Sequence, residues 1–337
     1  MVLNKILKNT FLFLIIPVVF ILIGCSSKEV YEPKDINITW DKYGIKDNGI
    51  IDITSDLALL ENRKVLSKDG IIDVKIKDSY RLVGNSDDWI ISSNIDGNIT
   101  LQSIADNSTQ EKFELRNTIA SASVKDDILA VLFADNEMAL YSVKTKELLL
   151  KEQGNAPIVV DSRIVNPFFM NDLVLFLTLD GKVVIINSEL KKKLRTIIVS
   201  TEDFFNNIIY FNVIDDKLIA ATAYKILSLG SKEVRVNYEV RNIAYDEKDI
   251  FITTKQGEVV SLTPDLQVNA KKKFPFAHFL GMITSGDKLF LLEKEGYIIE
   301  MSKNLLEYKV YEVDIPDGYI FTSDEMFQIN NEYISIK

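Results

Sequence analysis

The sequence predicts an all-β protein, a β-propeller of seven four-stranded blades. The first observation is an internal repeat of about 40 residues, a period typical of propellers. The second is a tight-turn signal inside the repeats, such as Asp96-Gly97 and Asp180-Gly181, because these residue types accept the positive φ angles of short hairpins. The third is that no long stretch has the 3.6-residue apolar period of a helix.

Each repeat begins with a polar pair, which is followed by an apolar strand, a turn and a second strand. The pattern predicts that the pair itself forms a tight turn at the entry to the apolar strand. The seven pairs are Asp87-Asp88, Asp126-Asp127, Asn171-Asp172, Asp215-Asp216, Lys248-Asp249, Gly286-Asp287 and Asn330-Asn331.

Two further strands complete each repeat, so that every unit has the four strands of a propeller blade. One apolar run precedes the polar pair, at Ile119–Val124, Val165–Met170, Ile208–Ile214, Ile243–Tyr245, Phe279–Thr284 and Met326–Ile329. The other follows the hairpin, at Lys112–Leu115, Glu147–Lys151, Leu194–Val199, Val234–Val240, Val268–Phe274 and Glu307–Val313.

The last unit has only two strands, which end at the C-terminus. An incomplete blade would expose a strand edge, so we expect Ile51–Glu61 and Arg63–Val74 to complete it and close the ring. Eight blades is the alternative, if Ile36–Ile53 adds strands; a pair of β-sandwiches or an irregular all-β domain is another. We expect the aromatic clusters to pack in the core: Phe168-Phe169, Phe204-Phe205, Tyr210-Phe211 and Phe274–Phe279.

The N-terminus has the pattern of a secretory signal, with Lys5 and Lys8 before an apolar run over 11–24. The sequence Leu22-Ile23-Gly24-Cys25 follows at its end and resembles the lipobox of bacterial lipoproteins. The resemblance implies that residues 1–24 are a signal peptide cut before Cys25. It also implies that the Cys25 thiol carries a diacylglycerol and its amino group an acyl chain.

An uncleaved membrane anchor and a plain signal peptide are the alternatives, although the apolar run is shorter than the roughly 20 residues of a spanning helix. We predict a lipidated tether over 25–35 and a single propeller domain over 36–337. Ser26, in place of Asp, favours sorting to the periplasmic side of the outer membrane, by resemblance to two-membrane bacteria. A Gram-positive source would place the protein on the outer face of its single membrane.

The composition disfavours several functions. The net charge of −10 is unfavourable for binding nucleic acid or an anionic lipid surface. Cys25 is the only cysteine and His278 the only histidine, so a zinc site or a Ser/His or Cys/His nucleophile pair is not expected. We interpret His278 as structural, and the basic runs Lys191–Lys193 and Lys271–Lys273 as solvated outer strand edges.

Two segments carry a family resemblance: Met138 to Glu147, and Asp180-Gly181 through Asn187. With the lipobox, they resemble the quinoprotein-type (PQQ-like) β-propeller lipoproteins, above all the BamB family of outer-membrane assembly lipoproteins. The resemblance covers most of the mature chain. In the family, a docking tryptophan usually closes each unit. This chain lacks that tryptophan, because Trp89 lies on a different strand and Trp40 precedes the ring.

The resemblance implies a non-enzymatic scaffold that holds the periplasmic modules of an assembly channel and is monomeric on its own. It implies no cofactor beyond the lipid on Cys25. An envelope propeller that binds another protein, a peptide or a glycan is the alternative, and a quinone-dependent dehydrogenase is a remote one. Asn37 and Asn98 lie in Asp-x-Asn-x-Thr patterns that resemble the extended bacterial N-glycosylation sequon.

Overall fold

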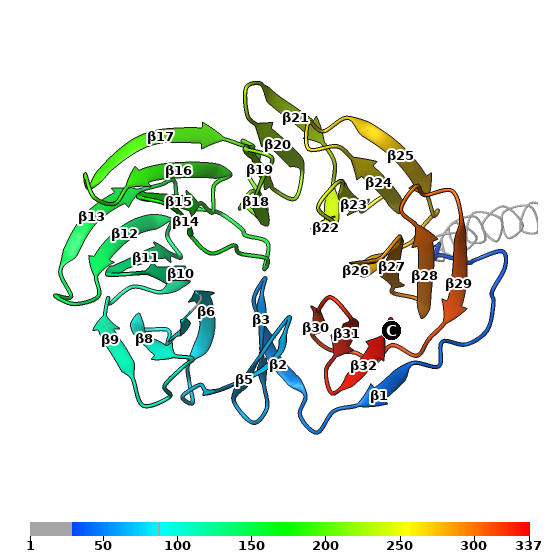
Figure 1. Cartoon of the computed structure of the whole chain (residues 1–337), viewed down its shortest axis with the longest axis horizontal. Coiled ribbons are helices and arrows are strands. Elements are labelled where there is room, and N and C mark those ends of the chain that lie inside the picture. The colour runs from blue at the N-terminus through cyan, green and yellow to red at the C-terminus, as the bar shows by residue number, and fades with distance from the viewer. Residues whose placement is uncertain (1–28, 87) are drawn as a thin grey trace, which may run out of the picture.

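The computed structural model describes residues 29–86 and 88–337. These residues form eight four-stranded antiparallel sheets, and no helix is found among them. Figure 1 shows the sheets arranged around a central axis, each with its first strand closest to the centre. The chain is therefore an eight-bladed β-propeller.

The first four blades follow one another along the chain, each as one four-stranded meander. They are blade 1, β2 (Ile50–Ile53), β3 (Leu57–Leu60), β4 (Lys64–Ser67) and β5 (Gly70–Lys75); blade 2, β6 (Arg81–Ser86), β7 (Trp89–Ser93), β8 (Asn98–Ser103) and β9 (Gln110–Glu114); blade 3, β10 (Ile119–Lys125), β11 (Ile128–Phe133), β12 (Glu137–Ser142) and β13 (Leu148–Gln153); and blade 4, β14 (Phe168–Met170), β15 (Leu173–Leu177), β16 (Lys182–Asn187) and β17 (Lys192–Ile198).

The remaining blades continue the ring, and the last one is shared by the two ends of the chain. They are blade 5, β18 (Tyr210–Ile214), β19 (Lys217–Ala221), β20 (Lys225–Leu229) and β21 (Glu233–Asn237); blade 6, β22 (Val240–Tyr245), β23 (Ile250–Thr254), β24 (Glu258–Leu262) and β25 (Val268–Lys273); blade 7, β26 (Phe279–Ser285), β27 (Lys288–Glu293), β28 (Tyr297–Ser302) and β29 (Tyr308–Glu312); and blade 8, β30 (Ile320–Thr322), β31 (Met326–Ile329), β32 (Glu332–Ser335) and β1 (Tyr43–Ile45).

The prediction of seven blades is wrong, and the alternative of eight is confirmed. Six of the polar pairs lie in blades 3 to 8, and Asp88 of the remaining pair lies in blade 2. The missing unit is blade 1, whose strands β2 to β5 span residues that we expected to close the ring. Its second turn places Arg63, not glycine, at a positive φ of 69°, so it lacks the Asp-Gly signal.

The N-terminus does share a blade with the C-terminus, as predicted, but a different segment makes the closure. The closing strand is β1, which pairs with β32 through Tyr43↔Ile334 and Ile45↔Glu332. It contributes the outermost strand, next to the three strands from the C-terminal end. Because β1 is only three residues long, its sequence has no strand periodicity that could identify it.

The tight turns between the second and third strands of the blades have the backbone geometry that the sequence predicts. Gly97, Gly181 and Gly257 have φ angles of 80°, 79° and 75°, and Asn136 has a φ of 68° in the equivalent turn. The pair Asn330-Asn331 differs from the other pairs because it joins the second and third strands of its blade, not the first and second.

The core consists of layers of apolar side chains between neighbouring blades. Residues from blades 2 and 3, for example, form one cluster that includes Ile91, Leu101, Val131 and Phe133, all at most 1% exposed. Burial on both faces of each sheet explains why the central strands have nearly continuous apolar sequences. The hydrophobic effect of these layers holds the ring together without a disulfide.

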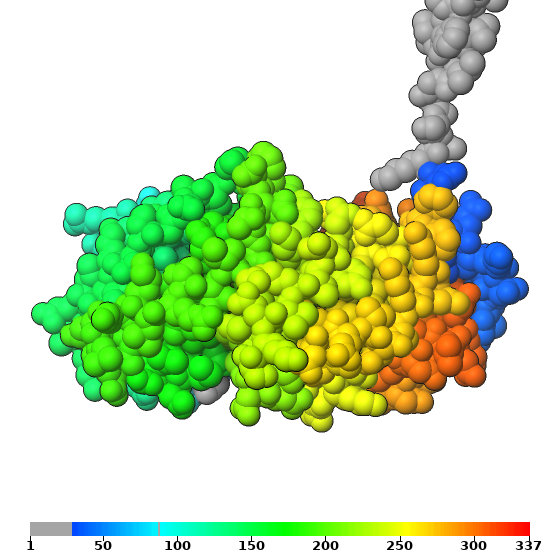
Figure 2. All heavy atoms as spheres, turned by 90° about the horizontal axis from the view of Figure 1, so that it is seen from above, coloured from blue at the N-terminus to red at the C-terminus, as the bar shows by residue number. Residues whose placement is uncertain are grey.

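Residues 31–45, here named the N-terminal strap, lie along the outside of blades 7 and 8. The strap begins at Tyr31, which is buried and packs edge-on against Phe274 and Tyr297 with ring centroids 6.0 and 5.7 Å apart. The chain is thus packed on the ring from Tyr31, inside the segment predicted as a tether over 25–35. Figure 2 shows these N-terminal residues in blue beside the orange atoms of blade 7.

The strap continues along the edge of blade 7, with an isolated parallel bridge between Thr39 and Glu312, and ends in blade 8. The backbone N–H of Asn37 donates to the Val310 carbonyl at 2.8 Å, and the N–H of Trp40 donates to the Glu312 carbonyl at 2.7 Å. The buried Trp40 indole Nε1 donates to the carbonyl of Ser335 at 2.9 Å. Trp40 therefore links the two ends of the chain.

The signal peptide over 1–24, Cys25 and the lipobox residues Leu22, Ile23 and Gly24 lie outside the described residues. From Glu29 onward, no helix has the length and hydropathy needed to cross a membrane.

Candidate protein-docking face

The alternation of strand direction gives the ring two different faces. One face carries the turns between the second and third strands of each blade and the connections from one blade to the next; we name it the connection face. The opposite face carries the first-to-second and third-to-fourth turns, and we name it the hairpin face. The strap begins at the connection face, because Tyr31 contacts Tyr297 directly after the Gly296 turn.

The two longest connections between described strands lie on the connection face, at 154–167 and 199–209. They are joined to each other by main-chain and side-chain hydrogen bonds. The N–H of Phe205 donates to the carbonyl of Val159 at 3.0 Å. The fully buried Asn207 accepts from the N–H of Asp161 at 2.6 Å and donates to the carbonyls of Asp161 and Arg163 at 3.2 and 3.1 Å.

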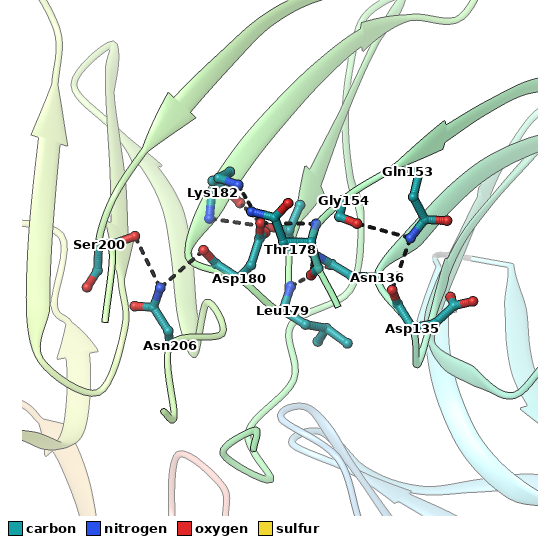
Figure 3. Close-up of polar contacts among 11 residues, drawn as sticks. Asp135, Asn136, Gln153, Gly154, Thr178, Leu179, Asp180, Lys182, Ser200 and Asn206 are labelled. Carbon is teal, nitrogen blue, oxygen red and sulfur yellow. Dashed lines mark hydrogen bonds and ion pairs between the residues drawn. The ribbon is translucent and has the colours of Figure 1, made fainter. Parts of the chain in front are cut away.

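Asn136 fixes the start of the first connection against the next blade (Figure 3). Its side chain is fully buried; Oδ1 accepts from the N–H of Leu179 at 2.9 Å, and Nδ2 donates to the carbonyl of Asn155 at 2.8 Å. The N–H of Gly154 donates to the Asn136 carbonyl at 3.0 Å. Because a buried polar group is costly to leave unpaired, this residue holds the connection in one position.

Asn206 plays the corresponding part in the second connection (Figure 3). It is buried, and its Nδ2 donates to the carbonyls of Asp180 and Ser200, both at 3.1 Å. The turn that it contacts is itself fixed, because Thr178 Oγ1 donates to Asp180 Oδ1 at 2.6 Å. Buried asparagines thus hold both connections on the strand ends beneath them.

An apolar patch lies exposed on top of this polar framework. It consists of Ile158 and Val159 from the first connection and Phe204 and Phe205 from the second, with exposed fractions of 69%, 41%, 51% and 41%. The prediction that Phe204-Phe205 packs in the core is therefore wrong, although Phe274 and Phe279 are buried as predicted. Contiguous exposed apolar side chains on a rigid base are typical of a docking surface.

Phe168 and Phe276 also differ from the core prediction, with exposed fractions of 38% and 57%. Phe168 packs against Phe211 with ring centroids 5.1 Å apart. Sequence periodicity could not separate the exposed aromatic residues from the buried ones, because those at 204, 205 and 276 lie in connections and not in strands.

An ion pair within the first connection fixes that connection to blade 6. Arg163 donates from Nε and Nη2 to the two carboxylate oxygens of Asp161, at 2.8 and 2.6 Å, and from Nη1 to the carbonyl of Arg241 on β22. Burial alone would raise the pKa of Asp161, but the hydrogen bonds and the charge of Arg163 outweigh burial and hold that pKa below its ordinary value. Asp161 is therefore ionised at neutral pH.

Replacing Arg163 by Gln is expected to lower the free energy of unfolding by about 1–2 kcal/mol at pH 7, because Asp161 loses its bidentate partner. A lowered carboxylate pKa stabilises the fold above the ordinary Asp value, about 4, and that contribution disappears as the pH falls through the folded-state pKa. The difference between native protein and variant in urea unfolding should therefore shrink as the pH falls below about 4. A difference that is constant with pH would contradict this account.

The other residues singled out in the sequence occupy separate places. Asn37 is exposed in the strap, whereas Asn98 is half-buried at the start of β8, where it pairs with Glu114. His278 lies in the connection to blade 7, where its backbone N–H donates to Glu293 Oε1 at 2.8 Å. No group of His, Cys, Asp and Glu side chains within 29–86 and 88–337 is arranged to hold a metal ion.

The basic runs have the placement that the sequence predicts. Lys192 and Lys193 lie on β17 and Lys271–Lys273 on β25, the outermost strands of blades 4 and 6. Most of these side chains are exposed, as expected for residues that discourage pairing at a strand edge.

Comparison with known proteins gives two kinds of similarity. No family model matches the chain. The plasminogen-binding protein PgbB of Helicobacter pylori strain J99 is 33% identical over 207 residues, which are 60% of this chain and 38% of that protein. PgbB of strain 26695 is 32% identical over 207 residues, which are again 60% of this chain and 38% of that protein. The chain thus spans well under half the length of the curated relatives it matches.

The solved structures share the fold at low sequence identity. BamB from Moraxella catarrhalis has a TM-score of 0.65 at 10% identity and covers 88% of this chain and 99% of its own. The C-terminal WD40 domain of Sif2 has a TM-score of 0.63 at 10% identity, covering 90% and 99%. The computationally designed protein Ika8 has a TM-score of 0.57 at 13% identity, covering 89% and 99%.

Proposed function

We propose that the chain is a non-enzymatic, lipid-anchored protein of the bacterial cell envelope that binds another protein through its connection face. The observation that carries the proposal is the apolar patch formed by Ile158, Val159, Phe204 and Phe205. Four exposed apolar side chains on ordered connections are unfavourable in water, and a partner's apolar surface would remove them from it.

The position of the strap supports a partner at the membrane. Five residues separate Cys25 from Tyr31, and the six extended residue-to-residue steps between them reach about 20 Å. With a lipid on Cys25, Tyr31 at the connection face would therefore lie within about 20 Å of the bilayer. A membrane-embedded or membrane-bound partner is consistent with this distance.

The similarities suggest two candidate partners. The propeller fold shared with BamB supports an outer-membrane assembly scaffold, in which this chain would hold the periplasmic modules of the assembly channel from the inner side of the outer membrane. The similarity to PgbB, whose name records plasminogen binding, supports plasminogen as the second candidate.

A photo-crosslinking amino acid at position 205 tests the proposal in the native membrane and with purified plasminogen. Crosslinking to the assembly channel would support the BamB-like role, and crosslinking to plasminogen would support the second candidate. Absence of a crosslink to either would overturn both.

Replacing Phe204 and Phe205 together by Asp should weaken partner binding by at least about tenfold, because central aromatic contacts commonly contribute 2 kcal/mol or more. The matched control is Leu190→Asp, at a side chain that is 70% exposed in a turn of the hairpin face. Binding measured by surface plasmon resonance should be unchanged in the control. Equal losses in both variants would show that the connection face has no special role.

A further inference from the structure

A cleft of roughly 580 Å³ lies between blade 8 and blade 1, where the ring closes. Its walls come from the connection over 46–48, the β4–β5 hairpin over 66–71, β30, the turn over 323–325 and β31. The volume is in the range of sites that bind small molecules and peptide side chains. The cleft lies in a different part of the ring from the apolar patch, which belongs to the connections of blades 3 to 5 (Figure 1).

The cleft exists because the two blades at the closure share little core. Four buried residues join them, Ile50, Ala58 and Leu60 of blade 1 and Phe321 of blade 8. This is the smallest buried cluster in the described part of the ring. The space that other blade pairs fill with side chains is thus partly open here.

The walls of the cleft are apolar at its base and rim. Leu60 and Phe321 are buried at the base, and Leu66 and Met326 are half-buried. Ile71 lies at the rim with 63% of its side chain exposed. These surfaces can accept an aliphatic or aromatic side chain.

The charged lining is predominantly acidic. Asp47, Asp69, Asp324 and Glu325 oppose Lys46 and Lys68, which gives a net charge of −2 from four negative and two positive groups. Glu325 is paired with Lys337 and Lys68 with Asp56. Within the described residues, Asp47, Asp69 and Asp324 form no ion pair, so their carboxylates are available to a cation.

The two lysines that line the cleft do not pair with its three free carboxylates. The ammonium of Lys46 lies 4.5 Å from the ring centroid of Tyr333, and that of Lys68 lies 3.5 Å from Asp56 Oδ1. Both lysines are thus held by contacts with residues that do not line the cleft.

One buried polar side chain in the lining has an unused acceptor. Gln328 is 4% exposed, and its Nε2 donates to the carbonyl of Asn330 at 3.5 Å, the outer limit of a hydrogen bond. Its Oε1 accepts no hydrogen bond from the residues that the structure describes. An N–H group entering the cleft could donate to this oxygen.

We propose that this cleft binds an extended peptide segment of a partner protein, in which a lysine or arginine lies beside an apolar side chain. The apolar residue packs on Leu66, Phe321 and Met326, and the cation lies among the three carboxylates. A peptide fits better than an isolated small cation because β5 is the edge strand of blade 1, and edge strands can pair with an added strand.

Isothermal titration calorimetry with the full mature chain tests the proposal. The probes are acetyl-Leu-Arg-Phe-amide and the matched acetyl-Leu-Glu-Phe-amide. We expect the arginine peptide to bind and the glutamate peptide to bind at least about tenfold more weakly. Equal binding of the two peptides, or binding of neither, would overturn the proposal. So would binding of arginine amide as tight as that of the arginine peptide.

The double variant Asp69→Asn/Asp324→Asn should bind the arginine peptide about tenfold more weakly, since it removes two charges from the exposed lining. The control is Asp126→Asn, in the first-to-second turn of blade 3, where Asn tolerates the φ of 52°. A second variant, Ile71→Lys, places a positive charge at the rim and should also abolish binding. Unchanged affinity in both cleft variants would overturn the proposal.

The inference is independent of the proposed docking at the connection face. The variant Phe204→Asp/Phe205→Asp should bind the arginine peptide with unchanged affinity, and the cleft variants should retain crosslinking at position 205. A negative result at the cleft can therefore be distinguished from a negative result at the connection face.

Discussion

Replacing Trp40 by Ala is expected to lower the free energy of unfolding of the 29–337 fragment by about 3–5 kcal/mol. The indole is buried at the closure, where its ring lies 5.0 Å from Tyr311 and 6.2 Å from Phe290, and it donates to the Ser335 carbonyl. The substitution removes these contacts from a strap residue that links β29 and β32. Urea unfolding followed by circular dichroism measures the loss.

The control for this prediction is Ile38→Ala in the same strap. Ile38 is 74% exposed, so its truncation should change stability by less than about 0.5 kcal/mol. A loss in I38A as large as in W40A would contradict the special role of the buried indole. Little loss in W40A would mean that the ring remains closed without the tryptophan.

Replacing Asn136 by Ala is expected to lower the free energy of unfolding by about 2–4 kcal/mol, because it leaves the buried Leu179 N–H unpaired and removes the hydrogen bond to the Asn155 carbonyl. The left-handed backbone at this turn adds about 1 kcal/mol, since alanine adopts a positive φ less readily than asparagine. The connection over 154–167 should also lose protection in hydrogen exchange, because its first residues lose their attachment to blade 4.

The matched control is Asn171→Ala. Asn171 has a φ of 54° but is exposed and makes no side-chain hydrogen bond with the described residues. This variant therefore measures the backbone cost alone, about 1 kcal/mol. Equal losses in N136A and N171A would contradict the role of the buried amide, and normal exchange at 154–167 would contradict its role in holding the docking face.

Local sequence signals were sufficient to identify most of the blades. The polar pairs and the positive-φ turns, such as Asp180-Gly181, depend only on neighbouring residues, because a tight hairpin requires particular residue types. They therefore predicted the all-β class and seven of the eight units. Blade 1 was missed because its strands β2 to β4 are four residues long and its second turn uses Arg63 in place of glycine.

The candidate docking face was less visible in the sequence. Phe204 and Phe205 have the same composition as a buried aromatic pair, and their exposure follows from the way in which Asn206 and Asn207 hold the connection. Those asparagines are ordinary loop residues by sequence, and their partners lie in segments distant in the chain, such as Asp161. The cleft between blades 8 and 1 could not be predicted for the same reason, since its walls come from both ends of the chain.

The sequence by itself determined the strand class, the repeat and its turns, because backbone conformation and alternating burial are local consequences of side-chain chemistry. Only the tertiary structure decided the number of blades, the closing strand and the exposed surfaces. The physical reason is that ring closure pairs β1 with β32 across nearly the whole chain, and side-chain exposure depends on which distant segments cover each residue.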